Sequence, residues 1–399
     1  MPIVDMKAML EHAHANRYAV GAFDLVSLDF LQGILDGAER CRAPVILSLA
    51  ESHFAYFDFD LLMPAVEAAA RRATVPVAIH LDHGERLESA VHAINLGCNG
   101  VMVDASHHPL EENIRLSRQV VEMAHGCGVP VEGELGYVPG VEGEDAERHP
   151  GEIAYTSVAD ARAYVEATGV DFLAVSIGTV HGRMRGRPQL DFDRLEAIDR
   201  ALGIPLVIHG GTGLSDEQFR RLVAHGVAKI NYYTALSDAA AARIDANGAA
   251  GGGYTARVAG VREAIAAEVE RCIRLWGGAG RAEEVLAVAS PWRPVEHVIL
   301  YEVDGLDAEA VTAMKARGRE VLSRIPGVRS VVTGEAIRPD APYRHAWLIR
   351  FCHEAVIESY RRHPDHVAFA DGYFRPHAHR RVSIDFRAEE AGDQSSPSQ

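Results

Sequence analysis

The sequence predicts an α/β protein, a (β/α)8 TIM barrel followed by a ferredoxin-like α+β domain. Short apolar runs rich in β-branched residues alternate with amphipathic helical stretches through about residue 235. The runs lack an apolar–polar alternation, which indicates buried parallel strands. Eight strand–helix units in this length match a closed barrel, although the pattern also allows a doubly wound open sheet. Near residue 295 the order of the patterns changes, which predicts the second domain.

The elements of the barrel can be assigned in chain order. The expected strands are Ala19–Phe23, Val45–Leu49, Val77–Leu81, Gly100–Val103, Val129–Glu134, Phe172–Ser176, Leu206–Ile208 and Ala228–Asn231. Helical patterns between them include Leu28–Arg40, Leu61–Ala73, Leu87–Leu96, Leu110–His125 and Asp216–His225. Several helices are followed by a glycine where a C-terminal cap belongs: Gly97, Gly169, Gly203 and Gly226.

Composition shifts divide the rest of the chain. The glycine-rich stretch Asn247–Tyr254 predicts a flexible excursion before a helix at Ala256–Trp276. Two prolines in Ala289–Val295 indicate a linker, so the barrel domain is expected at 1–288 and the second domain at 296–386. The second domain shows these patterns in order: strand His297–Val303, helix Ala308–Ile325, strands Val328–Ala336 and Ala346–Phe351, helix His353–His363 and strand Val382–Phe386. The polar residues 387–399 are expected to be disordered.

Composition excludes several classes of protein. A formal charge of −16 argues against general nucleic-acid binding, which uses clustered positive charge. No apolar run approaches the roughly 20 residues of a membrane span, and the first residues do not resemble a secretion signal. The five cysteines are scattered and form no CxxC pair, which indicates reduced thiols. We therefore expect a cytoplasmic protein that binds neither nucleic acid nor membranes.

Polar side chains gather where the predicted barrel strands end. All strands of a parallel barrel end at one mouth, and there the chain carries three histidines with several carboxylates: His83, His181, His209, Asp24, Asp82, Asp104, Glu132 and Glu134. Three neutral imidazoles with an open fourth position suit a catalytic zinc ion, which cobalt or iron could replace. Any one of the 20 histidines alone would be structural or on the surface. Three that follow three different strands point to a metal site.

Glycines near the same mouth suggest an anion site. The sequence HGGTG, with Gly210, Gly211 and Thr212, follows the seventh strand and leads into a helix, an arrangement whose backbone N–H groups accept phosphate. Gly182 offers another N–H group. With Asn231 and Thr234 the stretch matches the phosphate site that barrels build after strands seven and eight. A plain tight turn between strand and helix is the alternative.

Six ordered segments identify the first part of the chain as similar to class II fructose/tagatose-bisphosphate aldolases. They are LDHG, VMVDAS, VEGELG, AVSIGTVHG, IHGGTG and KINYYTAL, and the similarity spans roughly residues 1–288. The resemblance implies that His83, His181 and His209 hold a catalytic zinc ion. Asp104 and Glu134 would match a position for a second divalent or monovalent cation.

The resemblance also implies roles in catalysis. Asp82 would be the acid/base at the hydroxyl of the bond that is cleaved, and Glu142 would take a proton from the triose derived from the ketone. The residues expected to hold dihydroxyacetone phosphate are Gly182, Arg185, Gly210, Gly211, Thr212, Asn231 and Thr234, with Asp24 also in the substrate site. Glu142 stands in a glycine- and acid-rich loop that could equally be a solvated connector.

General chemistry agrees with these roles. Aldol cleavage leaves an enediolate, whose charge a divalent cation stabilises as a Lewis acid. A carboxylate must then carry the hydroxyl proton, and Asp82, next to ligand His83, is suitably placed. A mobile loop over the mouth could exclude water and bring in Glu142.

Several residues depart from the pattern of that family. Asp24 stands in GAFD where asparagine is usual, and Ala50 replaces a serine associated with the aldehyde half of the substrate. Arg185 replaces a lysine near the phosphate, which keeps a cation but changes a point charge to a fork. Tyr232 and Tyr233 are bulkier than expected. We therefore expect a ketose (bis)phosphate substrate that yields dihydroxyacetone phosphate, with an aldehyde other than glyceraldehyde 3-phosphate.

The second domain resembles the stress-responsive dimeric α+β barrel (Dabb) family. The segments HVILYEV, IPGVRSVVTG, HAWLIRF and RRHPDHVAF carry the resemblance. It implies pairing of two copies through their sheets, and thus a homo-oligomer, either a dimer or a tetramer. A second active site, suggested by His345, His366, His377 and His379, is the less favoured interpretation.

Two alternatives to a metal-dependent aldolase stay open at this point. Lys229, the only lysine near the rim, could form a Schiff base as in class I aldolases, although this leaves the three histidines unexplained. The barrel could also have lost its activity and serve a regulatory or binding role.

Overall fold

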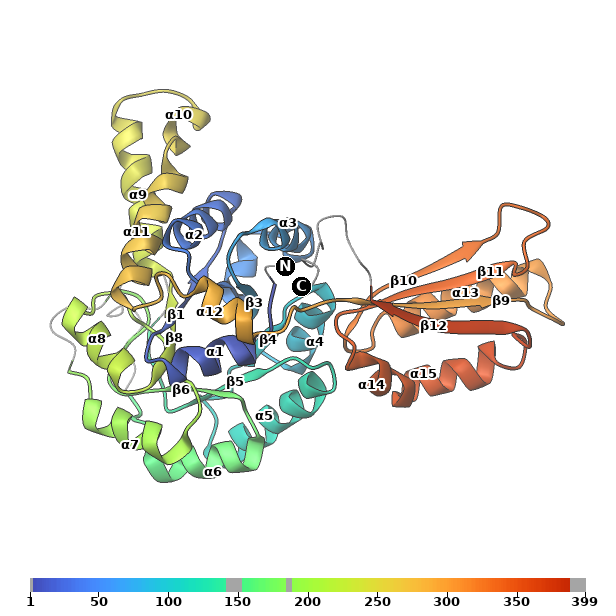
Figure 1. Ribbon diagram of the computed structural model, residues 1–399, viewed down its shortest axis with the longest axis horizontal. Helices are drawn as coiled ribbons and strands as arrows, with labels where there is room; N and C mark the ends of the chain where they lie inside the picture. The colour runs from blue at the N-terminus through green and yellow to red at the C-terminus, as the bar shows by residue number, and fades with distance from the viewer. Residues whose placement is uncertain (1–2, 141–152, 184–188, 388–399) are drawn as a thin grey trace, which may run out of the picture. The chain divides into compact units, whose positions relative to one another are not determined.

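A computed structural model describes residues 3–140, 153–183 and 189–387. Eight parallel strands close into a barrel in chain order (Figure 1). They are β1 (Val20–Asp24), β2 (Val45–Ala50), β3 (Val77–Gly84), β4 (Gly100–Val103), β5 (Val131–Leu135), β6 (Phe172–Val175), β7 (Leu206–Ile208) and β8 (Val227–Tyr232). Strand β1 pairs with both β2 and β8, so the predicted barrel is confirmed and the open sheet is wrong.

Helices surround the strands of the barrel (Figure 1). They are α1 (Met6–Ala15), α2 (Leu28–Cys41), α3 (Phe59–Arg72), α4 (Leu87–Leu96), α5 (Leu110–His125), α6 (Val158–Thr168), α7 (Phe192–Leu202), α8 (Asp216–Ala224), α9 (Thr234–Ala249), α10 (Tyr254–Val258), α11 (Val261–Leu275) and α12 (Ala282–Val288), with the short 3-10 helix η1 (Glu51–Ala55) after β2. None of the helices in the described ranges is long and apolar enough to cross a membrane.

The interior of the barrel is apolar at one end and polar at the other. Buried residues near the strand starts pack on α1, among them Val20, Ala22, Ile46, Phe172 and Val207. On the same face of the strands lie polar residues, either paired in register with these apolar residues or further along the strands: Asp24, Ser48, His80, Asp82, Glu132, Glu134, Lys229 and Asn231. Because paired residues of neighbouring strands point to the same face, this polar layer also faces the interior. The barrel therefore buries its charges at the mouth.

The segment after β8 differs from expectation. Helix α9 runs from Thr234 to Ala249 and so extends into the glycine-rich stretch. The helix expected at Ala256–Trp276 is two helices, α10 and α11, separated at Gly260, whose φ of +76° suits glycine. The apolar period continues across the break, and only the backbone conformation reveals it.

The C-terminal unit has the predicted β-α-β-β-α-β order. Its elements are β9 (Val295–Tyr301), α13 (Ala308–Leu322), β10 (Val328–Glu335), β11 (His345–Phe351), α14 (Val356–Arg362), α15 (Pro364–Phe369), the π-helical turn η3 (Ala370–Phe374) and β12 (Arg381–Arg387). The antiparallel sheet has the order β10-β11-β9-β12, which confirms a ferredoxin-like arrangement. Helix α14 lies within the helix expected at His353–His363, and the additional helix α15 begins at Pro364, which lacks the N–H group needed to continue α14 but is suited to a first helical turn.

Candidate active site

Three histidines meet at the polar mouth of the barrel. His83 is the next-to-last residue of β3, His181 lies in the loop after β6, and His209 directly follows β7. The ring centroid of His83 lies 5.1 Å from that of His181 and 4.6 Å from that of His209. One nitrogen from each ring falls within 4.8 Å of the other two. The three strands thus bring together the imidazoles that the sequence predicts as metal ligands.

The end of β3 is irregular, and this irregularity positions two neighbours for the same site. Consecutive side chains of a regular strand point to opposite faces, so Asp82 and His83 would diverge. The register with β4 shifts between Leu81 and Gly84, and His83 adopts a φ of +45°. Such a conformation is uncommon for a residue with a side chain. Every residue of the eight strands is buried except His83, which is partly exposed.

Carboxylates orient two of the imidazoles. Asp104 Oδ2 lies 3.2 Å from His83 Nδ1, and Glu132 Oε1 lies 2.9 Å from His209 Nε2. The opposite nitrogens, His83 Nε2 and His209 Nδ1, face each other at 2.8 Å. A carboxylate on the far nitrogen fixes the ring and raises its basicity toward a metal. This donor set fits a divalent cation held between the imidazoles.

A second group of possible ligands adjoins the first. His83, Asp104 and Glu134 offer atoms within 4.8 Å of one another, and Glu134 Oε2 lies 3.4 Å from His209 Nδ1. Burial, together with the charge of Asp104, raises the pKa of Glu134 well above its usual value. Burial also raises the pKa of Asp104, but its hydrogen bonds to His83 and Ser106 outweigh this and leave that pKa below its ordinary range.

Burial is the main cause that lowers the pKa of two of the three histidines, His181 and His209. It lowers the pKa of His181 to about 3, with the charge of His83 adding to the effect, and it lowers the pKa of His209 as well. Burial likewise acts to lower the pKa of His83, but Asp82, Asp104 and Glu134 outweigh it and raise the value. Since only an unprotonated imidazole nitrogen ligates a metal, the two buried rings are ready to bind at neutral pH.

Asp82 is completely buried at the end of β3. Its Oδ1 accepts a hydrogen bond of 2.9 Å from Asn231 Nδ2, and its Oδ2 accepts none from the residues the structure describes. Burial raises the pKa of Asp82, but the charges of His83, His209 and Lys229 outweigh it, so the pKa falls below the usual range. The side chain is therefore a carboxylate with one oxygen held and one available.

Glu132 and Lys229 complete a buried network, although neither residue is predicted from the sequence to be a metal ligand, proton carrier or substrate contact in the metal-dependent site. Lys229 Nζ lies 2.7 Å from Glu132 Oε2 and donates to Asn231 Oδ1 at 2.7 Å. Chains of contact thus run from ligand His209 through Glu132, Lys229 and Asn231 to Asp82. The signal was present in the two-residue spacing of Glu132 with Glu134 and of Lys229 with Asn231, since such residues share one face of a strand. An amine enclosed and ion-paired in this way is poorly placed for a Schiff base.

The glycine-rich loops of the expected phosphate site lie next to the histidines. Gly210 has a φ of +71°, and a Cβ there would lie 2.1 Å from the carbonyl oxygen of Val180. The loops after β6 and β7 therefore touch where Gly182, Gly211 and Thr212 also lie. Asn231 belongs to β8 and Thr234 opens α9. Glu142 and Arg185 fall outside the residues that the structure describes.

The four residues that depart from the family pattern lie in different surroundings. Asp24 pairs in register with Ser48, and Ala50 with Asp82. Tyr232 points outward, where its hydroxyl donates to Glu268 Oε1 at 2.9 Å. The Tyr233 ring packs on the buried ring of His53, with centroids 4.4 Å apart. Tyr232 faces away from the interior because consecutive strand residues face opposite sides, and its neighbour Asn231 is the one that faces the mouth.

Comparisons with known proteins agree with this geometry. The profile described as "Fructose-bisphosphate aldolase class-II" matches residues 4–281, and that described as "Stress Responsive A/B Barrel Domain" matches residues 295–388. The fructose-bisphosphate aldolase of Geobacillus stearothermophilus is 44% identical over 237 residues, which cover 59% of this chain and 82% of the relative. For that of Staphylococcus epidermidis the identity is 43%, with the same coverage. The crystal structure of the YdjI aldolase from Escherichia coli K12 has a TM-score of 0.64 at 34% identity, covering 70% of this chain and 99% of that one.

Proposed function

Because the chain belongs to the class II fructose-bisphosphate aldolase family and is a metal-dependent aldolase, we propose that its barrel mouth cleaves a ketose phosphate or bisphosphate reversibly to dihydroxyacetone phosphate and an aldehyde. The observation that carries this proposal is the convergence of His83, His181 and His209 beside the buried carboxylate of Asp82. Neither the Schiff-base mechanism nor a silent barrel accounts for that arrangement.

We propose zinc as the catalytic metal, held by the three histidines. Tetrahedral sites with three imidazoles and one open position are typical of catalytic zinc. When bound, the ion would polarise the ketose oxygens and stabilise negative charge on the triose. Asp104 and Glu134, with His83, would offer a second cation position, and the oxygen ligands there favour a hard cation.

Asp82 is proposed to hold and move the hydroxyl proton of the bond that is cleaved. The amide of Asn231 holds Oδ1, which leaves Oδ2 as the atom that receives the proton. A low pKa keeps this carboxylate ionised at neutral pH, as a base must be. The proposed contribution of Asn231 to substrate binding thus includes orienting Asp82. Glu142 is proposed as the second base, at the carbon of the triose.

The phosphate of dihydroxyacetone phosphate is assigned to the loops after β6, β7 and β8. The backbone N–H groups of Gly182, Gly210 and Gly211 would bind it, because glycine allows the backbone to approach an anion closely. Thr212, Thr234 and Arg185 would add side-chain donors. The contact between the loops at Gly210 and Val180 supports one shared anion site.

The aldehyde half is proposed to lack a phosphate near Asp82. Asp24 is fully buried and faces the interior, and Ala50, paired in register with Asp82, offers no hydroxyl donor. A carboxylate in a low-dielectric interior repels a nearby phosphate. We therefore propose an aldehyde other than glyceraldehyde 3-phosphate.

A metal analysis combined with a substrate panel tests the proposal. The protein should contain about one zinc per chain, lose cleavage on chelation, and regain it with zinc, as measured by release of dihydroxyacetone phosphate. Borohydride with substrate should leave Lys229 unlabelled. Zinc-loaded protein without cleavage across ketose phosphates would contradict the function, while fastest turnover of fructose or tagatose 1,6-bisphosphate would contradict only the aldehyde assignment.

We also propose that two copies of the chain pair through the open face of the C-terminal sheet. Apolar side chains on that face are exposed, namely Leu300, Val332, Leu348, Val382 and Ile384. They belong to all four strands and alternate with residues that face the helices. A contiguous exposed apolar patch of this kind marks an interface, and a self-complementary surface favours a second copy.

A further inference from the structure

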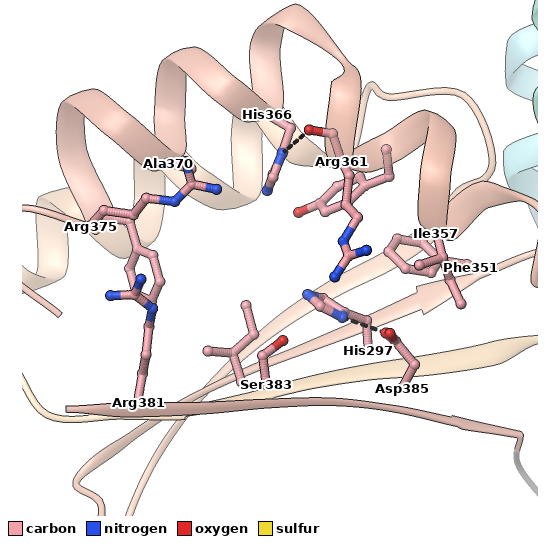
Figure 2. A pocket seen from close by; sticks show the side chains of 13 residues that line it. His297, Phe351, Ile357, Arg361, His366, Ala370, Arg375, Arg381, Ser383 and Asp385 are labelled. Atoms are coloured by element: carbon pink, nitrogen blue, oxygen red, sulfur yellow. Dashed lines mark hydrogen bonds and ion pairs between the residues drawn. The ribbon is translucent and has the colours of Figure 1, made fainter. Parts of the chain in front are cut away.

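The C-terminal unit has a cavity of about 250 Å³ between its sheet and its helices, and this cavity is partly open to solvent. Figure 2 shows side chains from β9, β12, α14 and α15 pointing into this space. It lies on the helix-covered face of the sheet, so the open face that we assign to pairing does not contribute to it. Its volume is slightly below the roughly 300 Å³ at which pockets for drug-sized ligands begin. A compact ligand would fit.

Positive charge is concentrated around this cavity. Arg361, Arg375 and Arg381 line it, against the single carboxylate of Asp385. Arg375 and Arg381 stand on one side and Arg361 on the other, beneath His366 (Figure 2). The chain as a whole has a net charge of −16, so this group of three guanidinium groups contrasts with the rest of the molecule. Guanidinium groups bind carboxylates and phosphates, and the cavity therefore favours an anion.

The partners of these arginines leave much of their hydrogen-bonding capacity unused. Arg375 pairs with Asp371, which lies one helical turn earlier. Arg381 donates to the carbonyl oxygen of Ala378 at 2.7 Å, and Arg361 lies 4.0 Å from Glu358. A guanidinium group has five N–H donors, so each of the three can still bind an anion in the cavity.

One polar pair on the sheet is already hydrogen-bonded. His297 Nδ1 lies 2.6 Å from Asp385 Oδ1, which gives this carboxylate oxygen a partner and leaves the other ring nitrogen of His297 toward the cavity. The hydroxyl of Ser383 lies beside it. These groups add polar contacts without cancelling the excess of guanidinium charge.

The remaining wall is apolar and partly aromatic. Ile299 and Phe351 line it from the sheet, and Ile357 and Phe374 from the helical side. The Tyr360 ring lies 4.9 Å from that of Phe351. A ligand that uses both kinds of wall must carry an anionic group at one end and a compact apolar body at the other.

We propose that this cavity binds a small organic anion, either a carboxylate or a phosphate ester, whose charged group pairs with Arg375 and Arg381 and whose apolar body lies on Phe351 and Phe374. The site is separate from the barrel mouth and does not depend on the aldolase reaction. It gives the C-terminal domain a ligand of its own in addition to pairing.

Calorimetric titration of the full-length, zinc-loaded protein tests the proposal with three matched probes: benzoate, phenyl phosphate and uncharged benzyl alcohol. Benzoate or phenyl phosphate should bind at one site per chain, at least tenfold more tightly than benzyl alcohol. Binding of phenyl phosphate alone would indicate a phosphate ester, whereas binding of benzoate would indicate a carboxylate. The double variant Arg375→Gln/Arg381→Gln should weaken the binding at least tenfold and leave ketose cleavage unchanged.

Arg338→Gln is the control, since this exposed arginine pairs with Asp340 away from the cavity and its loss should change nothing. If the double variant fails to fold, Arg361→Gln makes the same test from α14. The proposal is overturned if neither anion binds at millimolar concentration, if benzyl alcohol binds as tightly as the anions, or if the arginine variants bind the anions as well as the parent.

Discussion

The hydrogen bond between Asn231 and Asp82 shows how single side chains set the chemistry of the mouth. Each residue of the buried network has a partner of opposite character: Lys229 lies against Glu132, Glu132 against His209, and Asn231 against both Lys229 and Asp82. Charges are costly inside a protein unless they are paired. The network therefore stabilises the fold and aims Asp82 at the same time.

Asp82→Asn is expected to lower cleavage of the preferred ketose phosphate about 10²- to 10⁴-fold, because an amide cannot accept the hydroxyl proton. The shape of the side chain is preserved, so zinc content should be unchanged by elemental analysis. Asp245→Asn, at an exposed position of α9, serves as the control. A variant with nearly full activity would show that another group moves the proton.

Asp24→Asn should shift substrate preference toward a bisphosphate. Removing one buried carboxylate near the bound aldehyde lessens repulsion of its phosphate, and we expect the ratio of kcat/KM for fructose 1,6-bisphosphate to that for fructose 1-phosphate to rise about tenfold, or about 1.4 kcal/mol. The double variant Asp24→Asn/Ala50→Ser should rise further. An unchanged ratio would locate the specificity elsewhere.

Lys229→Met should destabilise the protein by about 3–5 kcal/mol, because it leaves the buried charge of Glu132 without its ammonium partner. Chemical denaturation measures this loss. The double variant Lys229→Met/Glu132→Gln should recover much of it, since no uncompensated charge remains. If the single variant is as stable as the parent, the contact does not hold the two charges in place.

Among the structural elements, the ends of the barrel strands and the loops after them do most to build the site. The bulge in β3 turns His83 toward the other histidines, and the contact between the loops after β6 and β7 brings His181 next to His209. Loops carried on a rigid barrel can hold such a geometry because the strands beneath them are packed on both faces.

Gly210→Ala tests the contact between these loops. A Cβ would lie 2.1 Å from the carbonyl oxygen of Val180, so the loop must shift, and we expect KM for the ketose phosphate to rise at least tenfold. Gly203→Ala is the matched control, because its φ is also positive but nothing lies within 4 Å of the added Cβ. Both variants should lose about 1–2 kcal/mol of stability from backbone strain, and only the first should affect KM.

At the scale of the whole molecule, two folded units with different chemistry share one chain. The first carries a metal-dependent aldolase barrel, and the second has an α+β sheet with an arginine-lined cavity on one face and exposed apolar side chains on the other. An exposed apolar face of this kind usually marks a surface that binds another protein.

Leu348→Glu/Ile384→Glu should convert the proposed dimer to a monomer, as measured by light scattering after size-exclusion chromatography. Buried glutamates without partners are strongly unfavourable at an apolar interface. Ile337→Glu is the control, since this side chain is 99% exposed in a loop. A parent protein that is monomeric at micromolar concentration would contradict pairing through this face.

Much of this protein is determined by its sequence alone. Buried strands and their period predict the barrel, and residues at strand ends predict that His83, His181 and His209 share a mouth, because the parallel topology dictates it. The tertiary structure decided the rest. The positive φ of His83 depends on a bulge against β4, the pairing of Lys229 with Glu132 depends on strands about 97 residues apart in sequence, and the separation of Arg361, Arg375 and Arg381 into walls of one cavity depends on how helices cover a sheet. Period and composition record local preference, whereas these features arise only where distant segments meet.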